Sequence, residues 1–296
     1  MSDAKILKEC IALADELATI LRLGNPLPAN QDFSADEREA LLACRKSARM
    51  KNVVSSSPAM DCLRMAISSK YLPALATAIV TTSPVTQPQA YAAYIQRFVT
   101  LLPASSNPYL RKFFREALLS AQFVDTIAER FLDGTMDNNL VLQGATARIL
   151  CEAMWWSDPS RGDDKNACFD AALRDKLEAK VSGYVEQHES GVESAPEAKP
   201  AKEAAHNTVM VELKKTLISV RFLSFNGDAA YINGVRNLME QDTPGEQGMC
   251  QVCYATDDDE DLLRCSRCKD ITYCSPDCQK IGWGKGHRLR CFTYSF

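Results

Sequence analysis

The sequence predicts a mainly α-helical protein that ends in a small cysteine-rich module. Through the first 240 residues, apolar side chains recur at three- and four-residue spacing, and alternating stretches of the β type are nearly absent. Seven of the twelve cysteines fall between residues 250 and 291. With 296 residues, 46% of them hydrophobic, the chain can bury a sizeable core before that module begins.

The region before the module is interpreted as a series of amphipathic helices joined by short breaks. One apolar face runs from Tyr91 to Phe98, in a helix expected over residues 88–102. Ser34 and Glu37 have the spacing of a capping box, which predicts a helix from residue 35. The pattern indicates an α-solenoid or an irregular helical bundle; an armadillo-like arrangement follows from the number of helices alone, since no repeat of about 40 residues is apparent. Further helices are expected over 4–23, 58–70, 72–82, 108–119, 124–131, 140–156 and 165–187.

The chain divides into four predicted segments. Residues 1–188 form the helical domain. Residues 189–205 lack aromatic residues and carry one large aliphatic residue, Val192, so we expect a flexible linker or loop. Helical spacing returns over 206–241, an extension expected to pack on the first domain. A turn-rich hinge at 241–248 then leads to the cysteine-rich module at 249–296.

Charge and hydropathy exclude several classes of protein. A formal charge of −4 and a pI near 5.6 argue against a nucleic-acid-binding protein. Residues 1–23 mix acidic with apolar side chains, unlike a signal peptide. The most apolar window, residues 71–80, is shorter than the roughly 20 residues that span a bilayer. We therefore expect a soluble intracellular protein, in the nucleus or the cytoplasm, with no membrane partner.

The spacing of the C-terminal cysteines predicts metal ligands. Clustered cysteines in a reducing compartment indicate metal rather than disulfides. Eight candidate ligands in four pairs suit two tetrahedral structural Zn²⁺ sites, one with four cysteines and one with three cysteines and a histidine. Spacing alone is compatible with sequential or interleaved pairing. The ligands are Cys250, Cys253, Cys265, Cys268, Cys274, Cys278, His287 and Cys291.

Other uses of these cysteines fit less well. A redox motif needs one reactive CxxC pair in a βαβ setting, and four pairs are present here. Hydrolytic zinc requires an open coordination position, whereas protein ligands can fill every position here. Ser275 and Pro276 predict a helix start after Cys274, and residues 262–264 can pair with 271–273 as a hairpin.

These ligands, with "YCS" at 273–275 and Trp283 between Cys278 and His287, resemble the MYND-type zinc finger. The resemblance covers about 14% of the chain, residues 250–291, and the helical region resembles no family that we can name. It implies interleaved pairing: Cys250, Cys253, Cys274 and Cys278 on one zinc, and Cys265, Cys268, His287 and Cys291 on the other.

The resemblance also implies a peptide-binding groove. Related fingers bind proline- and leucine-containing segments of the type Pro-x-Leu-x-Pro, and their groove positions match Ser266, Gln279 and Trp283. A preorganised indole stacks well on proline at a low entropic cost. The alternative for Trp283 is packing inside the finger, a role compatible with binding, and the alternative for Ser266 and Gln279 is that they serve only the local turns.

Nucleic acid is a disfavoured partner of the finger. Residues 249–296 carry seven Lys or Arg and seven Asp or Glu side chains, and the "DDDED" run at 257–261 would repel phosphate. Affinity for nucleic acid depends on surplus positive charge.

The leading hypothesis is therefore a non-enzymatic adaptor whose finger binds a proline-containing segment of another protein, in the transcriptional or chromatin setting usual for the family. Two alternatives stay open. The helical domain could carry an enzyme activity, although no catalytic motif points to one. The finger could instead be a structural lid on the helical domain, as the aromatic tail "CFTYSF" at 291–296 suggests.

Overall fold

The computed structural model describes residues 2–157, 169–192, 200–225, 229–240, 248–256 and 261–296. Residues 241–247 of the predicted hinge at 241–248 and residues 257–260 of the acidic run lie outside the described residues.

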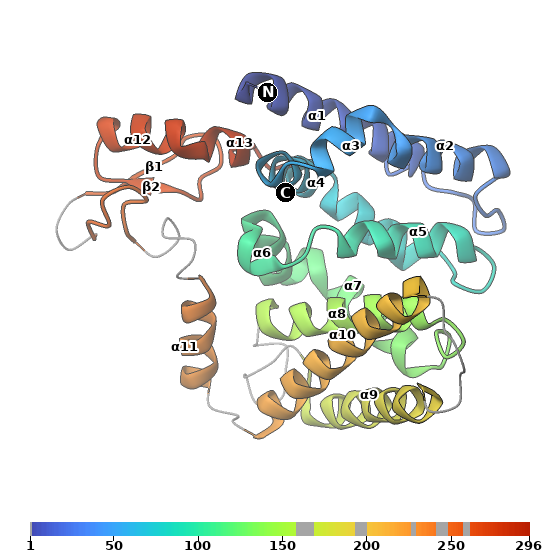
Figure 1. The fold of residues 1–296 in the computed structure, drawn as a ribbon. Helices are drawn as coiled ribbons and strands as arrows, with labels where there is room; N and C mark the ends of the chain where they lie inside the picture. Colours follow the sequence, from blue (N-terminus) through green and yellow to red (C-terminus); the bar gives the residue numbers. More distant parts are fainter. Residues whose placement is uncertain (1, 158–168, 193–199, 226–228, 241–247, 257–260) are drawn as a thin grey trace.

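The helical part is a stack of helices that follows the order of the chain, from α1–α3 at one end to α9 and α10 at the other (Figure 1). Helix α4 packs on α1, α5, α6 and α7, while α8 packs on α7 and α10. The helices are α1 (Asp3–Ile20), α2 (Ala35–Lys46), α3 (Ala48–Val54), α4 (Ser57–Thr81), α5 (Pro88–Val99), α6 (Pro108–Arg115), α7 (Ala117–Leu132), α8 (Leu140–Trp156), α9 (Ala171–Val192), α10 (Pro200–Phe225) and α11 (Ala229–Glu240).

The mainly α-helical class is confirmed, and local caps explain several helix starts. Ser34 accepts a hydrogen bond from the Glu37 N–H, and the Glu37 carboxylate accepts one from the Ser34 N–H, so the predicted capping box is present. Asn107 and Asn139 cap α6 and α8 with their side-chain oxygens, which accept from the N–H groups of Leu110 and Leu142. The armadillo-like arrangement stays a prediction.

The core of the helical part is aromatic at its centre. The rings of Phe98 and Phe123 stack at 4.6 Å, and Phe113 meets both edge to face. These side chains come from α5, α7 and α6 and are fully buried. Phe296, at the C-terminal end of the chain, adds its ring to Phe113 at 6.5 Å. The core is therefore shared between the helices and the last residues of the chain.

The expected break between helices 58–70 and 72–82 is wrong, because α4 runs unbroken through Pro73. A proline inside a helix has no N–H to give to the carbonyl four residues earlier, here that of Ser69. That carbonyl accepts from the backbone N–H of Ser295 at 3.0 Å and from the Ser295 hydroxyl at 3.4 Å. Most of α4 is buried, and the tail supplies the missing donor, so the helix continues.

Other boundaries differ from expectation. The predicted helix 108–119 is interrupted at Glu116, whose extended backbone separates α6 from α7. The predicted linker 189–205 is helical at both ends, since α9 continues to Val192 and α10 begins at Pro200. Residues 193–199 lie outside the described residues.

The C-terminal module lies at one corner of the stack, and its last residues return to α4 and α6 (Figure 1). It contains β1 (Leu263–Arg264), β2 (Thr272–Tyr273), α12 (Pro276–Gly282) and α13 (Arg288–Arg290). A π-type turn, Trp283–His287, joins the two helices. The predicted hairpin is present, with Leu263 paired to Tyr273 and Arg264 to Thr272 in antiparallel register.

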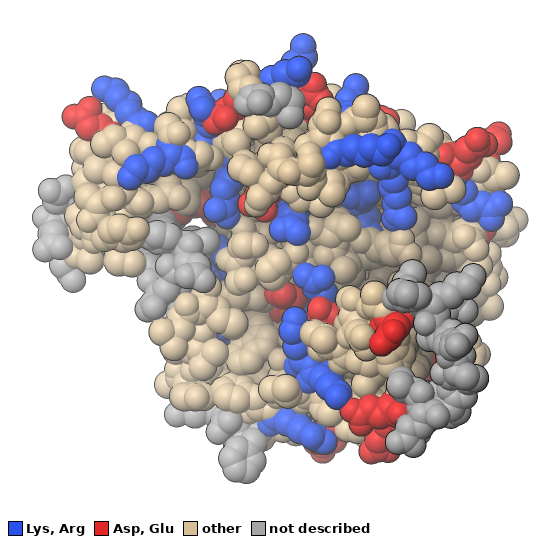
Figure 2. Space-filling model, viewed as in Figure 1, with Lys and Arg blue, Asp and Glu red and all other residues tan. Residues whose placement is uncertain are grey.

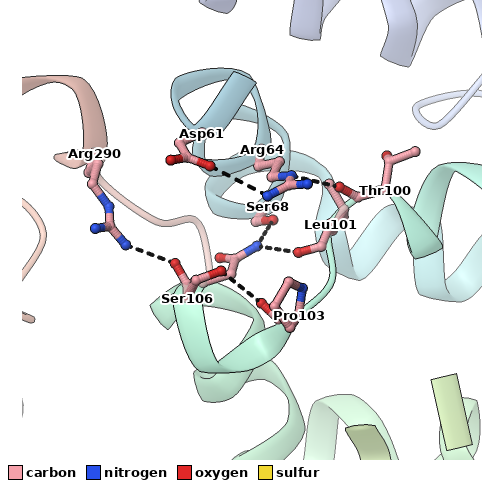
Figure 3. A network of polar contacts seen from close by, with 9 residues as sticks. Asp61, Arg64, Ser68, Thr100, Leu101, Pro103, Ser106 and Arg290 are labelled. Atoms are coloured by element: carbon pink, nitrogen blue, oxygen red, sulfur yellow. Dashed lines mark hydrogen bonds and ion pairs between the residues drawn. The ribbon is translucent and has the colours of Figure 1, made fainter. Parts of the chain in front are cut away.

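Polar contacts fix the module to the helices. Arg288 forms an ion pair with Asp3, and Arg290 donates to the Ser106 carbonyl at 2.8 Å (Figure 3). The Tyr109 hydroxyl lies 3.0 Å from the carbonyl oxygens of Arg290 and Phe292, and it accepts from the Phe292 N–H at 2.7 Å. Because Tyr109 is buried, these bonds are formed out of water.

Across the described residues, no helix combines the length and the apolar character that a membrane crossing requires.

Candidate metal centre and peptide-binding face

Two similar knuckle turns position the first four cysteines. In the first, the Tyr254 N–H donates to the Cys250 carbonyl at 2.9 Å; in the second, the Lys269 N–H donates to the Cys265 carbonyl at 3.0 Å. Tyr254 and Lys269 each follow the second cysteine of their pair, and both adopt positive φ, 64° and 59°. This left-handed residue turns the chain sharply, so both sulfurs of a pair face one point.

The first cluster contains Cys250, Cys253, Cys274 and Cys278. The Sγ atom of Cys274 lies 3.4 Å from that of Cys253 and 3.5 Å from that of Cys278, and the third distance, Cys278 to Cys253, is 3.9 Å. Four thiolates bound tetrahedrally at about 2.3 Å from Zn²⁺ lie about 3.8 Å apart. The donor set and its spacing therefore fit a zinc ion.

The second cluster contains Cys265, Cys268, His287 and Cys291, all buried. The Sγ atoms of Cys265 and Cys291 are 3.6 Å apart, and Cys268 Sγ lies 3.4 Å from His287 Nε2. These distances also fit a tetrahedral zinc ion. The pairing of ligands is interleaved along the chain, as the family resemblance implied.

Helix α12 begins where a zinc ligand is needed. The Ser275 hydroxyl accepts from the Cys278 N–H at 3.2 Å, and Pro276 occupies the first turn, as the sequence predicted. Cys278 therefore sits in the first turn of the helix, four residues after Cys274, a ligand of the same cluster.

Hydrogen bonds prepare two of the ligands to bind metal as thiolates. Burial acts to raise the pKa of Cys250, but the backbone N–H groups of Cys253, Cys274 and Val252 outweigh it and lower that pKa to about 6. The Cys291 thiol lowers the pKa of Cys268 to about 3 against burial, with His287 and backbone groups assisting. Thiolate is the form that binds zinc.

The histidine ligand has a partner on its other nitrogen. Its Nδ1 atom contacts the Tyr273 hydroxyl, and that hydroxyl donates to Gln251 Oε1 at 3.2 Å. When Nε2 binds zinc, Nδ1 carries the proton and donates to Tyr273. Such outer partners orient a ligating histidine. Sequence reasoning missed Tyr273 and Gln251, because their spacing along the chain carries no signal for this contact.

The three predicted peptide-binding residues lie on the finger's surface. Ser266 and Gln279 are exposed, and Trp283 is half-buried. The Trp283 indole meets the His287 ring edge to face at 5.5 Å, and the Arg267 guanidinium lies 5.7 Å from the indole centre. Trp283 thus packs in the finger and stays half-buried, and its role in peptide binding stays a prediction.

Within the described residues, the β1 edge of the hairpin has no further strand partner. Cys265 donates to Ile271 at 2.8 Å, so the next pair outward, Arg264 and Thr272, directs its backbone groups away from the ladder. On the β2 side, Gln251 donates to the Thr272 carbonyl at 3.0 Å. In the described part of the finger, β1 pairs in the sheet with β2 alone.

Fold and site together define the class: a helical protein that carries a two-zinc MYND finger. Residues 250–291 match the family model described as the MYND finger, which confirms the resemblance and its two structural zinc ions. MYND fingers are protein-interaction modules.

Two curated relatives share the finger with this chain. "Ubiquitin carboxyl-terminal hydrolase 16" of Arabidopsis thaliana is 48% identical over 46 residues, 16% of this chain and 4% of that protein. "Ubiquitin carboxyl-terminal hydrolase 19" of the same plant is 39% identical over 56 residues, 19% of this chain and 7% of that protein. The chain thus matches a small part of these relatives, and the match is confined to the finger. No solved structure matches the chain.

Proposed function

We propose that this protein is a non-enzymatic adaptor whose MYND finger binds a proline- and leucine-containing segment of a partner protein. The observation that carries the proposal is the placement of Trp283. Zinc ligands hold the chain on both sides of it, Cys278 five residues before and His287 four residues after. A rigid, partly exposed indole is a suitable surface for a proline ring, because little conformational entropy is lost on binding.

The neighbouring residues support a peptide ligand. Gln279 and Ser266 are exposed and can exchange hydrogen bonds with a peptide backbone. The outward N–H and C=O groups of Arg264 could accept an added strand, which is a common way to bind an extended peptide. Leu263, 55% exposed on the same strand, offers an apolar contact for a leucine side chain.

Docking of the finger leaves this face available. The hydrogen bonds and the ion pair with the helices described above come from residues 288–296. Among the described residues, no hydrogen bond, ion pair or ring contact joins Ser266, Gln279 or Trp283 to the helical part. The docked tail supports a structural role for residues 288–296, as the lid hypothesis suggested, and that role is compatible with peptide binding.

A catalytic role for the zinc ions is disfavoured on chemical grounds. Each cluster offers four protein ligands, which complete a tetrahedron and leave no position for a water or a substrate. The hydrolase names of the two relatives belong to those proteins, whose match to this chain is confined to the finger. We further propose that the adaptor acts in transcriptional or chromatin regulation, which is the usual setting of the family.

A peptide-display screen tests the proposal directly. The zinc-loaded full chain is expected to enrich peptides with proline and leucine at fixed spacing, and a Trp283→Ala chain that retains two zinc ions is expected to lose them. Enrichment of the same peptides by both proteins would exclude Trp283 from recognition. Enrichment of no motif by the wild-type protein would contradict the adaptor function.

A further inference from the structure

The boundary between the finger and helices α4 and α6 contains a cleft on another side of the finger from Trp283, with the zinc ligands Cys268 and His287 in its wall. It consists of two hollows of about 300 and 310 Å³ that share Pro108, Arg111 and Asp270 in their walls. We call it the junction cleft. Hollows of this size accommodate a few side chains of a ligand.

The walls of the junction cleft carry a strong positive charge. Seven basic and three acidic side chains line the two hollows, a surplus of four positive charges on a chain whose formal charge is −4. On the face that Figure 2 draws, Lys and Arg side chains lie on both sides of the boundary between the finger and the helices. The basic residues are Arg264, Lys269, Lys285 and Arg290 of the finger and Arg111, Lys112 and Arg115 of α6.

The cationic groups differ in how they are held. Arg111 is buried and fixed, with its guanidinium donating to the Ala104 carbonyl at 2.8 Å. Lys269 and Lys285 are exposed, and within the described residues neither forms an ion pair. The cleft therefore combines a buried, hydrogen-bonded cation in its wall with exposed lysines at its rim, an arrangement suited to a ligand with several negative charges.

Two features of the backbone add to the attraction for anions. Ser57 and Pro58, in the first turn of the 25-residue helix α4, line the cleft, and the N-cap residue Ser56 makes no side-chain cap. The N-terminal end of a long helix carries partial positive charge. Of the acidic wall residues, Asp61 already pairs with Arg64 at 3.4 Å (Figure 3), which reduces its repulsion of a bound anion.

We infer that the junction cleft binds an acidic peptide segment, rich in Asp and Glu, of a partner protein. Peptide carboxylates suit this surface better than nucleic acid does. The positive charge lines two small hollows of about 300 and 310 Å³, whereas a nucleic-acid backbone needs a surplus of positive charge along its length. This inference is independent of the Trp283 face, since of the residues named for the two sites they share Arg264, whose side chain lines the cleft and whose backbone lies at the edge of β1.

Fluorescence anisotropy on the zinc-loaded full chain tests the inference. The probes are a labelled Glu- and Asp-rich peptide without proline or leucine and the same peptide with Gln and Asn in place of Glu and Asp. The acidic peptide is expected to bind at low ionic strength and to weaken as salt is added, whereas its neutral counterpart does not bind. Equal binding of the two peptides would overturn the inference.

Charge reversal locates the site. Lys269→Glu combined with Lys285→Glu is expected to weaken binding of the acidic peptide roughly tenfold or more, since each change replaces attraction by repulsion. Lys280→Glu, on an exposed lysine of α12 outside the cleft, is the matched control and should change binding little. If the double Glu variant loses zinc, the corresponding Lys→Gln changes are used, with a loss of about threefold expected.

Two results would contradict the site assignment. Unchanged affinity in the folded double variant would place the peptide elsewhere. Tighter binding of a single-stranded oligonucleotide of equal charge, lost in the same variant, would make the cleft a nucleic-acid surface instead. Because the probe lacks proline and leucine, neither result bears on the proposed function of the Trp283 face.

Discussion

The backbone N–H of Ser295 donates to the carbonyl oxygen of Ser69 at 3.0 Å, four residues before Pro73 in α4. Ser69 is buried, and the proline leaves its carbonyl without a partner inside the helix. Ser295 therefore supplies a hydrogen bond that α4 lacks, although it lies more than 200 residues away in the sequence. This contact makes the tail part of the helical core.

Replacing Ser295 by proline removes the donor and should destabilise the protein. An unsatisfied buried carbonyl costs about 1–3 kcal/mol, so the free energy of unfolding should fall by that amount in Ser295→Pro. Ser295→Ala keeps the N–H and should cost clearly less. In a Pro73→Ala background, which restores the helix bond, the cost of Ser295→Pro should shrink. Denaturant titration of wild type, Ser295→Pro, Pro73→Ala and the double variant measures the coupling between the two positions. Additive changes in the free energy of unfolding would refute the role given to Pro73.

Tyr109→Phe should loosen the docking of the finger. The change removes the hydroxyl that bonds the Arg290 carbonyl and the Phe292 N–H. Loss of these bonds should lower the free energy of docking by about 1–3 kcal/mol. Hydrogen exchange of the Phe292 amide should accelerate. The control, Tyr231→Phe, alters a tyrosine that is 53% exposed and should leave that amide protected. Equal protection in both variants would mean that Tyr109 does not hold the tail.

Gly282→Ala should disrupt the finger, whereas Gly284→Ala should not. A Cβ atom at Gly282 would lie 2.6 Å from a ring carbon of Tyr273, while one at Gly284 would meet nothing within 4 Å. The first change therefore forces Tyr273 away from His287. We expect a loss of zinc from Gly282→Ala at chelator concentrations that wild type and Gly284→Ala withstand. Equal zinc retention by both variants would contradict the packing of Tyr273 on α12.

Tyr273→Phe should weaken one zinc site selectively. It keeps the ring but removes the hydroxyl that contacts His287 Nδ1. Loss of such an outer partner commonly lowers metal affinity 10- to 100-fold. In a chelator competition, one zinc ion per chain should leave about tenfold more readily than in wild type, and the other should be unaffected. Simultaneous faster loss of both ions would indicate general unfolding of the finger instead.

The local features of the finger could be predicted from the sequence, because they depend on neighbouring residues. Ligand spacing gave the eight zinc ligands, Ser275 and Pro276 marked the start of α12, and the hairpin followed from the stretches on either side of the second knuckle. In the helical part, the Ser34–Glu37 capping box was readable for the same reason.

Features that depend on distant contacts could not be predicted. The break expected between helices 58–70 and 72–82 is absent, and α4 continues through Pro73 because Ser295 supplies a donor from a distant part of the chain. The outer partner of His287 was missed because Tyr273 reaches it only once the hairpin and α12 are packed together. The junction cleft forms only where the finger docks on α6, so no single segment of the sequence predicts it.

The central claim is that zinc builds the finger and the unligated residue Trp283 recognises the partner. The most direct measurement is the Kd of a Pro-x-Leu-x-Pro peptide for the full chain and for Trp283→Ala, with two zinc ions per chain verified in both. Loss of the indole contact should weaken binding at least tenfold, as expected for an aromatic anchor. Equal affinity of the two zinc-loaded proteins, or no binding to wild type, would contradict the account.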